Sequence, residues 1–246
     1  MPRPDTGGGT IVLDLDHTMV GDVTPLLHRY AVLRAVRKLG LPGPCPDAAL
    51  VDVLSTTPLL RPGLTEFLRR SVASGKKLYV FTASERAWAT ALVRAIQRVT
   101  GVRFARPLFA RDNCHVRGDG SGMLGKSLTR LGPRRLVGAH PPVVIDNAAV
   151  WEDVASLGAR FVMCPTYRYA PFVDVLEGIP ASTLRDPRLS ALVSDLVASG
   201  GCYDPTRYRD AVKSACARHR FLAAAALRTL RQNEGTVKDA FFHGVA

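Results

Sequence analysis

Two aspartates one residue apart, Asp14 and Asp16, end the apolar run that begins at Ile11. Such a run is typical of a buried parallel strand, and side chains two residues apart lie on the same side of an extended backbone. Two negative charges beside an apolar wall repel each other unless a cation or a shared proton offsets them. Because parallel sheets bind ligands beyond the carboxyl ends of their strands, the pair predicts a site. The plain alternative is a strand and a turn, with Asp16 or Thr18 capping a helix.

The composition is that of a folded protein that favours anionic partners. The 246 residues, 47% of them hydrophobic, suffice for one large α/β domain, alone or with an appendage. The net charge of +12 favours phosphoproteins, nucleic acid or an acidic surface without choosing among them. The five cysteines form no CxxC pair, which indicates neither a disulfide framework nor a zinc site. With no bilayer-spanning stretch, we expect a soluble intracellular protein, cytoplasmic or nuclear, without a membrane partner.

Apolar runs alternate with helical periodicities, which predicts a doubly wound parallel α/β sheet. Strands are predicted from Ile11 and at 77–81, 142–146 and 160–163. Helices are predicted from Thr24 to Gly40, from Arg61 to Leu68, through Trp88 to Ile96, and around 150–157.

The chain is predicted to have three parts. Residues 1–10 form a flexible N-terminus, 11–184 the α/β domain with a helical insert at about 22–60, and 185–246 a basic helical C-terminal extension. A charge-rich helix is either a solvated face or a docking surface, and both interpretations of the extension stay open.

Four separated motifs each follow a predicted strand or lie in a loop. They are Asp14-Leu-Asp16-His-Thr18, Phe81-Thr82-Ala-Ser84, Gly125-Lys126-Ser-Leu-Thr-Arg-Leu-Gly132 and Val144-Ile-Asp146-Asn147. Together with Arg61-Pro-Gly-Leu-Thr-Glu-Phe-Leu68 they resemble the NLI-interacting-factor group of haloacid-dehalogenase-type phosphohydrolases, which includes the small phosphatases of the RNA polymerase II C-terminal domain. The resemblance covers about residues 11–180, and the ordered combination is far more specific than any single motif. It implies a HAD-like Rossmannoid phosphatase domain.

The chemistry of these residues supports the resemblance. Phosphoryl transfer needs an in-line nucleophile, a proton donor for the leaving oxygen, and positive charge around the equatorial oxygens. Asp14 can be the nucleophile, forming an aspartyl-phosphate, and Asp16 the acid and then the base. Groups expected to hold or neutralise the phosphoryl group are Thr18, Thr82, Ala83, Ser84 and Lys126. The plain alternatives are a helix cap for Thr82 and a surface position for Lys126.

The resemblance also implies a Mg²⁺ ion. Its ligands would be the Asp14 carboxylate, the Asp16 carbonyl oxygen and Asn147, completed by a phosphate oxygen and water. Asp146 would hold a metal-bound water or orient a neighbour, or it is a turn former.

Residues 120–127 also match the P-loop pattern. A P-loop follows directly on a hydrophobic strand, whereas residues 111–119 are polar, and little chain remains before Asp146 for a kinase core. Lys126 is therefore assigned to the phosphatase site.

Three features depart from the family pattern. His17 stands where Glu is common and Ser127 where Asp is usual, and both changes alter local pKa values without removing a required group. The insert after Asp22 is predicted to be helical, whereas the small polymerase-tail phosphatases carry a short β insert that accepts proline. The peptide preference therefore stays open.

The leading hypothesis is a Mg²⁺-dependent phosphatase of phosphoserine or phosphothreonine in proteins. Trp88 either packs against a substrate proline or belongs to the core, and Arg117 could approach the phosphopeptide. A second hypothesis is a phosphatase of nucleic-acid ends or small phosphometabolites, with nucleic acid not favoured. A third is a catalytically silent interaction module, against which the intact Asp14 and Asp16 count.

Overall fold

The computed structural model describes residues 8–118, 122–132, 140–171, 173, 176–189, 191 and 239–245. The described residues divide into two compact units, which we treat separately: 8–21, 60–168 and 239–245 in the first, and the described parts of 22–59 and 169–191 in the second. Most of the predicted helical C-terminal extension lies outside the described residues, as do residues 1–7 of the predicted flexible N-terminus.

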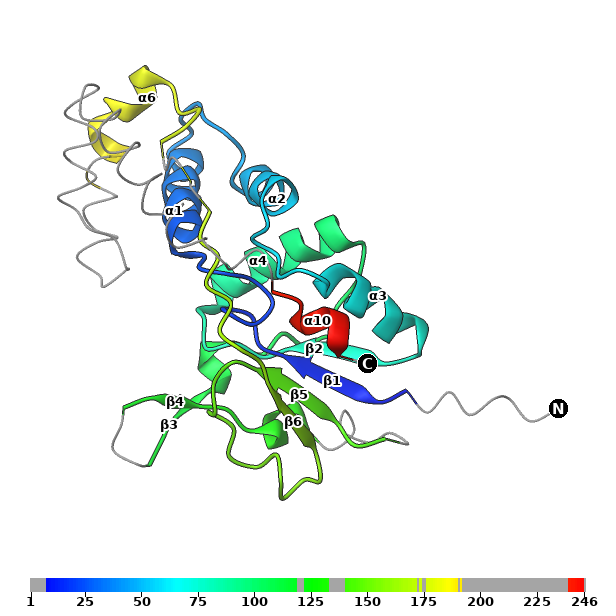
Figure 1. Ribbon diagram of the computed structural model, residues 1–246. Coiled ribbons are helices and arrows are strands. Elements are labelled where there is room, and N and C mark those ends of the chain that lie inside the picture. Colours follow the sequence, from blue (N-terminus) through cyan, green and yellow to red (C-terminus); the bar gives the residue numbers. More distant parts are fainter. Residues whose placement is uncertain are drawn as a thin grey trace. The chain divides into compact units, whose positions relative to one another are not determined.

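The first unit is built on a parallel four-stranded sheet with the order β2-β1-β5-β6 (Figure 1). The strands are β1 (Thr10–Leu13), β2 (Lys77–Val80), β5 (Val143–Asp146) and β6 (Arg160–Met163). In the register, Leu13 lies beside Val80 on one side and Ile145 on the other. The predicted parallel α/β class is confirmed, because each predicted strand starts within about one residue of its observed start.

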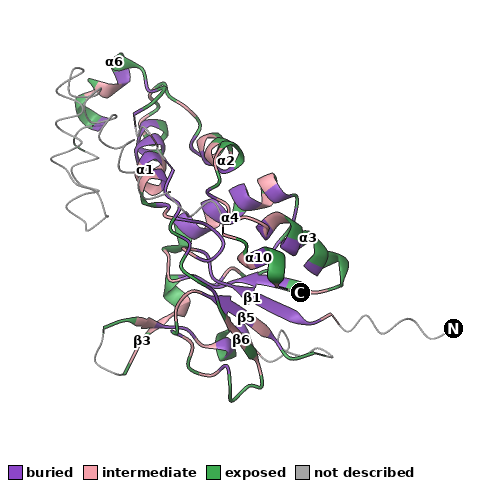
Figure 2. Cartoon of the chain, in the orientation of Figure 1, coloured by how far each residue is buried: buried purple, intermediate pink, exposed green. Residues whose placement is uncertain are grey.

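Successive side chains of each strand face opposite sides of the sheet. On one side, Val12, Tyr79 and Val144 form a row across the sheet and pack with Leu128 and Leu131 of the short 3₁₀ helix η2 (Leu128–Leu131). The helices α3 (Leu64–Ala73), α4 (Arg86–Thr100) and α10 (Phe241–Gly244) lie on the other side (Figure 1). Strand β1 is buried throughout and β5 along most of its length, whereas the edge strand β6 is partly exposed (Figure 2).

A short hairpin precedes the motif that contains Lys126. The 3₁₀ helix η1 (Arg111–Asn113) leads into β3 (His115–Val116), which pairs antiparallel with β4 (Leu124–Gly125). Directly after β4, the Lys126 N–H donates to the Val150 carbonyl oxygen at 2.8 Å. The hairpin and this hydrogen bond fix the backbone position from which the Lys126 side chain extends.

The predicted helix around residues 150–157 is wrong, because the chain forms turns there. The Asp153 carboxylate instead accepts hydrogen bonds from the N–H groups of Leu128 and Thr129, at 2.8 and 3.0 Å. Gly158 then reverses the chain with a φ of 63°. Long-range capping of η2 therefore overrides the local helical pattern.

The second unit contains the predicted helical insert. It comprises α1 (Thr24–Lys38), α2 (Pro46–Thr56) and the short α6 (Ala181–Leu184). Leu33 and Val36 of α1 pack with Leu176, Ile179 and Leu189. Val23 is the N-cap residue of α1, and the Thr24 N–H donates to Asp22 Oδ1 at 2.9 Å. None of the described helices has both the length and the apolar character to cross a membrane.

Candidate active site

Asp14 is the first residue beyond β1, and its N–H donates to the Ile145 carbonyl oxygen at 2.9 Å. Its side chain is buried, with the residue 5% exposed. Lys126 Nζ donates to Asp14 Oδ1 at 2.5 Å and to Asp146 Oδ2 at 2.8 Å. The ends of the parallel strands β1 and β5 bring the two carboxylates together, and Lys126, which follows β4 of the hairpin, places its ammonium between them.

The charges of this cluster do not balance. Burial raises the pKa of Asp14 to about 7, and the charges of Asp146 and Asp16 add to the rise, while Lys126 opposes it. For Lys126, burial alone would lower the pKa, but its pairing with Asp14 and Asp146 raises it above the usual range. The lysine therefore stays cationic, and it pairs with two carboxyl groups rather than one.

Asp16 is held by two hydroxyl groups from the loop after β2. Its Oδ2 accepts from Ser84 Oγ at 2.6 Å and from Thr82 Oγ1 at 3.2 Å. Its Oδ1 is buried and accepts no hydrogen bond from any described residue. One oxygen therefore orients the carboxyl group while the other has no protein partner, a geometry that suits an acid and base.

The predicted phosphate ligands divide into different positions. The hydroxyl protons of Thr82 and Ser84 are directed at Asp16, so in this structure these groups orient the acid. Thr18 is buried, and its Oγ1 donates to Asn147 Oδ1 and accepts from the Asn147 N–H, both at 3.1 Å. Thr18 therefore orients the predicted metal ligand. Ala83 lies in the same loop as Thr82, and its carbonyl oxygen is occupied by an arginine Nε at 2.8 Å.

Asp146 has protein donors on both oxygens. Oδ1 accepts from the Ala148 N–H at 2.9 Å, and Oδ2 accepts from Trp151 Nε1 at 2.8 Å as well as from Lys126. These bonds leave it little capacity for a metal, so its geometry suits anchoring of Lys126. Sequence reasoning missed Trp151, whose ring lies 5.6 Å from the Lys126 ammonium and whose only signal was an indole five residues after the motif aspartate.

The donor set fits a Mg²⁺ ion. Asp14 Oδ2 receives no hydrogen bond from a described residue, Asn147 supplies an amide oxygen, and Asp16 adds its carbonyl oxygen. Mg²⁺ takes oxygen ligands and keeps several waters, so few protein ligands are needed. Within the described ranges, no group of three or more His, Cys, Asp or Glu side chains is arranged to hold a metal.

The two peripheral candidates lie in contrasting surroundings. Trp88 is 5% exposed on the inner side of α4, which favours the core alternative over contact with a substrate proline. Arg117 Nη1 donates to the Ala149 carbonyl oxygen at 3.4 Å, two residues beyond Asn147, so this arginine borders the loop of the fourth motif.

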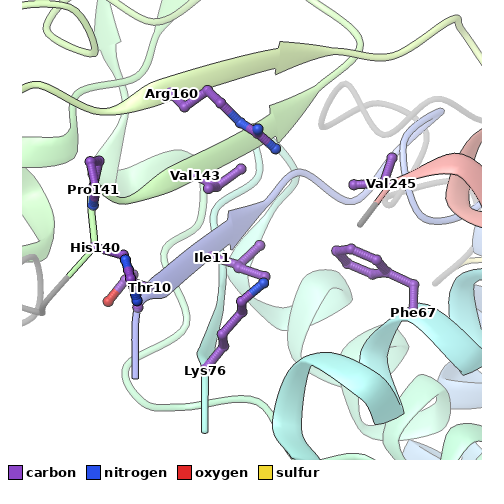
Figure 3. A pocket seen from close by; sticks show the side chains of 10 residues that line it. Thr10, Ile11, Phe67, Lys76, His140, Pro141, Val143, Arg160 and Val245 are labelled. Atoms are coloured by element: carbon purple, nitrogen blue, oxygen red, sulfur yellow. The ribbon is translucent and has the colours of Figure 1, made fainter. Parts of the chain in front are cut away.

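A cavity of about 390 Å³ lies at the opposite, amino end of the sheet (Figure 3). Its lining includes Ile11, Val143 and Arg160 from three strands, with Phe67 of α3 and Val245 beside them. None of the predicted site residues contributes to it. The catalytic candidates therefore occupy the carboxyl end of the sheet and this cavity the other end.

The parallel sheet carries Asp14 and Asp16 after β1, and Lys126 lies between the carboxylates of Asp14 and Asp146. This arrangement defines a phosphatase of the HAD-like class, a hydrolase of phosphate esters. Residues 9–154 match the family model of the NLI interacting factor-like phosphatases, and the chain belongs to this family. The resemblance drawn from the motifs is thereby confirmed.

Among solved structures, the chain is similar to Fcp1, an essential RNA polymerase II CTD phosphatase, at 18% identity with a TM-score of 0.39. The match covers 98% of this chain and 68% of that one. A fission yeast Fcp1 variant bound to beryllium fluoride gives 17% identity and a TM-score of 0.41, with the same coverage of the two chains. CbbY from Rhodobacter sphaeroides in complex with phosphate gives 19% identity and a TM-score of 0.37, and the match covers 69% of this chain and 91% of that one. No curated protein matches the chain.

Proposed function

We propose that this chain is a Mg²⁺-dependent protein phosphatase that acts on phosphoserine or phosphothreonine through an aspartyl-phosphate on Asp14. One observation supports it above all: Asp14 is buried, Lys126 holds its Oδ1, and its Oδ2 receives no bond from a described residue. A carboxylate fixed by one oxygen presents the other as a positioned nucleophile.

In the first step, an Asp14 oxygen attacks phosphorus and the ester P–O bond breaks. The departing alkoxide oxygen takes a proton from Asp16, whose carboxyl group Thr82 and Ser84 hold in place. Such proton transfer contributes about a hundred- to ten-thousand-fold in rate. The alcohol side chain of the substrate leaves as a neutral hydroxyl group.

In the second step, water attacks the phosphorus of the aspartyl-phosphate and Asp16 takes back a proton from it. The Asp14 acyl P–O bond breaks, inorganic phosphate leaves, and both carboxyl groups return to their starting states. Lys126, anchored by Asp146, offsets negative charge on Asp14 and on the phosphoryl oxygens throughout.

Asp14, the Asp16 carbonyl oxygen and Asn147 would hold the Mg²⁺ ion. When bound, this ion withdraws negative charge from the phosphoryl oxygens and balances the excess carboxylate charge of the site. Thr18 keeps the Asn147 amide oxygen in place for this role.

For the substrate we propose phosphopeptides like those of the RNA polymerase II C-terminal domain, which Fcp1 is named for dephosphorylating. The net charge of +12 and the two arginines beside the loops of the second and fourth motifs, Arg111 at Ala83 and Arg117 at Ala149, support an anionic peptide. Trp88 is left out of this proposal because of its burial.

The test uses p-nitrophenyl phosphate first and a substrate panel second. We expect Mg²⁺-dependent hydrolysis that Asp14→Asn abolishes. In the panel, phosphoserine and phosphothreonine peptides should be cleaved faster than 5′-phosphorylated oligonucleotides or sugar phosphates. The reverse ranking would favour a nucleic-acid or metabolite phosphatase, and no hydrolysis of any substrate with Mg²⁺ would favour an interaction module.

A further inference from the structure

Arg61 opens the Arg-Pro-Gly motif, and neither the proposed chemistry nor the helix after it needs a charged side chain there. The residue is 1% exposed. Its Nε donates to Asp239 Oδ1 at 2.9 Å and its Nη2 to Asp239 Oδ2 at 2.6 Å, which makes a bidentate pair. Its Nη1 donates to the Thr18 carbonyl oxygen at 3.4 Å. Because a buried guanidinium is costly to desolvate, the fold must hold these partners in place.

Three aromatic rings surround the same guanidinium. Its central carbon lies 4.7 Å from the ring centre of Phe241, 5.5 Å from that of Tyr167 and 5.8 Å from that of Phe242. Phe242 is fully buried and packs on Phe67 of α3, with 5.0 Å between ring centres. The carboxylate and two of the rings come from residues 239–245, which we call the C-terminal segment; its helix α10 lies beside α3 (Figure 1).

Arg61 also contacts the loop that follows the catalytic aspartates. The Thr18 carbonyl oxygen that it binds belongs to the residue whose hydroxyl orients Asn147. Tyr167 holds His17, the residue before Thr18: the Tyr167 N–H donates to the His17 carbonyl oxygen at 2.9 Å, and His17 Nδ1 lies 3.1 Å from the Tyr167 carbonyl oxygen. His17 has a φ of 60°, which side-chain-bearing residues rarely adopt, so this loop depends on surrounding contacts.

We propose that Arg61 is a positioning residue and that the C-terminal segment is the latch that fixes it. The segment clamps the guanidinium, the guanidinium and Tyr167 hold the backbone of His17 and Thr18, and Thr18 then orients Asn147. The inference rests on the proposed function, since it adds a support to the same site. Arg61 and Asp239 are 178 residues apart, so docking of the segment couples a distant part of the chain to the catalytic loop.

A purely structural ion pair would behave differently. Its loss would lower the unfolding temperature while each molecule that remained folded kept the same loop. A positioning role requires the loop itself to change in folded molecules. The loop must therefore be measured directly, below the unfolding temperature of every variant.

The experiment compares the full chain with Asp239→Asn, which removes the charge, and Arg61→Lys, which keeps the charge and loses the bidentate geometry. Asp239→Glu is the conservative variant. Asp186→Asn, which breaks the pair with Arg188 in the second unit, is the matched control. Amide hydrogen exchange is read by mass spectrometry on the peptide covering residues 14–20, without substrate. Mg²⁺ binding is read by calorimetry and turnover with p-nitrophenyl phosphate.

We expect exchange in residues 14–20 to become roughly tenfold faster in Asp239→Asn and Arg61→Lys, with β6 unchanged. The Mg²⁺ dissociation constant should rise about tenfold, as for other outer-shell partners. Turnover per folded molecule should fall about ten- to a hundredfold, because small misplacements cost that much. Asp239→Glu should recover most of each effect, and Asp186→Asn should match the wild type.

Unchanged exchange in residues 14–20 of folded Asp239→Asn overturns the latch, whatever the turnover. Faster exchange in a protein whose wild type hydrolyses no phosphate ester supports the latch and overturns the proposed function instead. If Asp239→Asn does not fold, Phe241→Leu decides the matter, because it removes one ring over the guanidinium and leaves the ion pair intact. It should raise exchange in the same peptide by a smaller factor, and no rise there counts against the latch.

Discussion

The first unit buries two clusters of oppositely charged side chains. They differ in how completely the cation of each cluster balances the carboxylates around it. Around Arg61 one carboxylate meets one guanidinium, and the hydrogen bonds from Arg61 outweigh partial burial and hold the pKa of Asp239 below its usual range. Around Lys126 one ammonium meets two carboxylates, and burial raises the pKa of Asp14 to about 7. The first cluster is complete in itself, whereas the second is short of positive charge. That shortage marks the site prepared for a ligand.

The largest effect is expected when the proposed nucleophile of the Lys126 cluster is removed. Asp14→Asn should reduce Mg²⁺-dependent turnover of p-nitrophenyl phosphate to background, since no other carboxylate has a free oxygen at that position. Asp16→Asn should cost about a hundred- to ten-thousand-fold on a phosphoserine peptide and less on the aryl ester, whose leaving group needs less protonation. Steady-state kinetics on both substrates checks this. Equal losses of kcat/KM, which reports the steps up to release of the alcohol, would remove the acid role from Asp16.

The next effect removes the cation of the same cluster. Lys126→Met should lower turnover by about a hundred- to a thousandfold, because it deletes the charge that offsets Asp14 and the phosphoryl group. Lys76→Met is the control, since Lys76 lines the cavity at the amino end of the sheet. Comparable losses in both variants would mean that the loss of a lysine, rather than its place between two carboxylates, causes the defect.

Metal exchange tests whether the missing charge is supplied by Mg²⁺. Activity should disappear in EDTA and return with Mg²⁺ but not with Ca²⁺, whose wider coordination shell would misplace the nucleophile. Asn147→Ala should raise the half-saturating Mg²⁺ concentration by about ten- to a hundredfold, and Thr18→Val by less. Titrations of activity against each cation provide the measurement. Full activity in metal-free buffer would exclude this role for the cluster.

The smallest effect is on stability and follows from the raised pKa of Asp14. The folded value of about 7 lies above the ordinary 3.8, so the folded state binds more protons and the free energy of unfolding falls as the pH rises from 4 to 7. Asp14→Asn mimics the protonated form. In EDTA at pH 8 it should unfold several degrees above the wild type, with roughly 2–4 °C for each kcal/mol. Thermal scans at pH 8 and pH 5 should show this difference in unfolding temperature shrinking at the lower pH. A wild type that unfolds at a higher temperature than Asp14→Asn at pH 8 would contradict the prediction.

The strands and the pair of aspartates after β1 could be predicted because their signals are local. An apolar run that ends in Asp14 and Asp16 predicts both the strand and the charged groups at its end. The family resemblance added Lys126 and Asn147, and the structure brings Lys126 to Asp14. The helical period around Trp88 was also correct, but a period alone does not reveal which face the rest of the chain covers.

The remaining features depend on contacts between distant residues. The bond from Trp151 to Asp146 needs the turn that replaces the predicted helix at 150–157, and that turn is set by the capping of η2. The pairing of Arg61 with Asp239 crosses most of the chain and has no local pattern at either end. Such contacts follow from tertiary packing, which no window of sequence contains.

The most direct test is to find where the phosphate goes. Asp16→Asn is mixed with p-nitrophenyl phosphate and Mg²⁺, quenched in acid and digested for mass spectrometry. An aryl leaving group needs little protonation, whereas the attacking water still needs a base, so the intermediate should accumulate in this variant. We predict one added phosphate on Asp14, absent without Mg²⁺ and absent when Asp14→Asn is added to the same chain. Phosphate on any other residue, or turnover by a chain that lacks the Asp14 carboxylate, would contradict the mechanism.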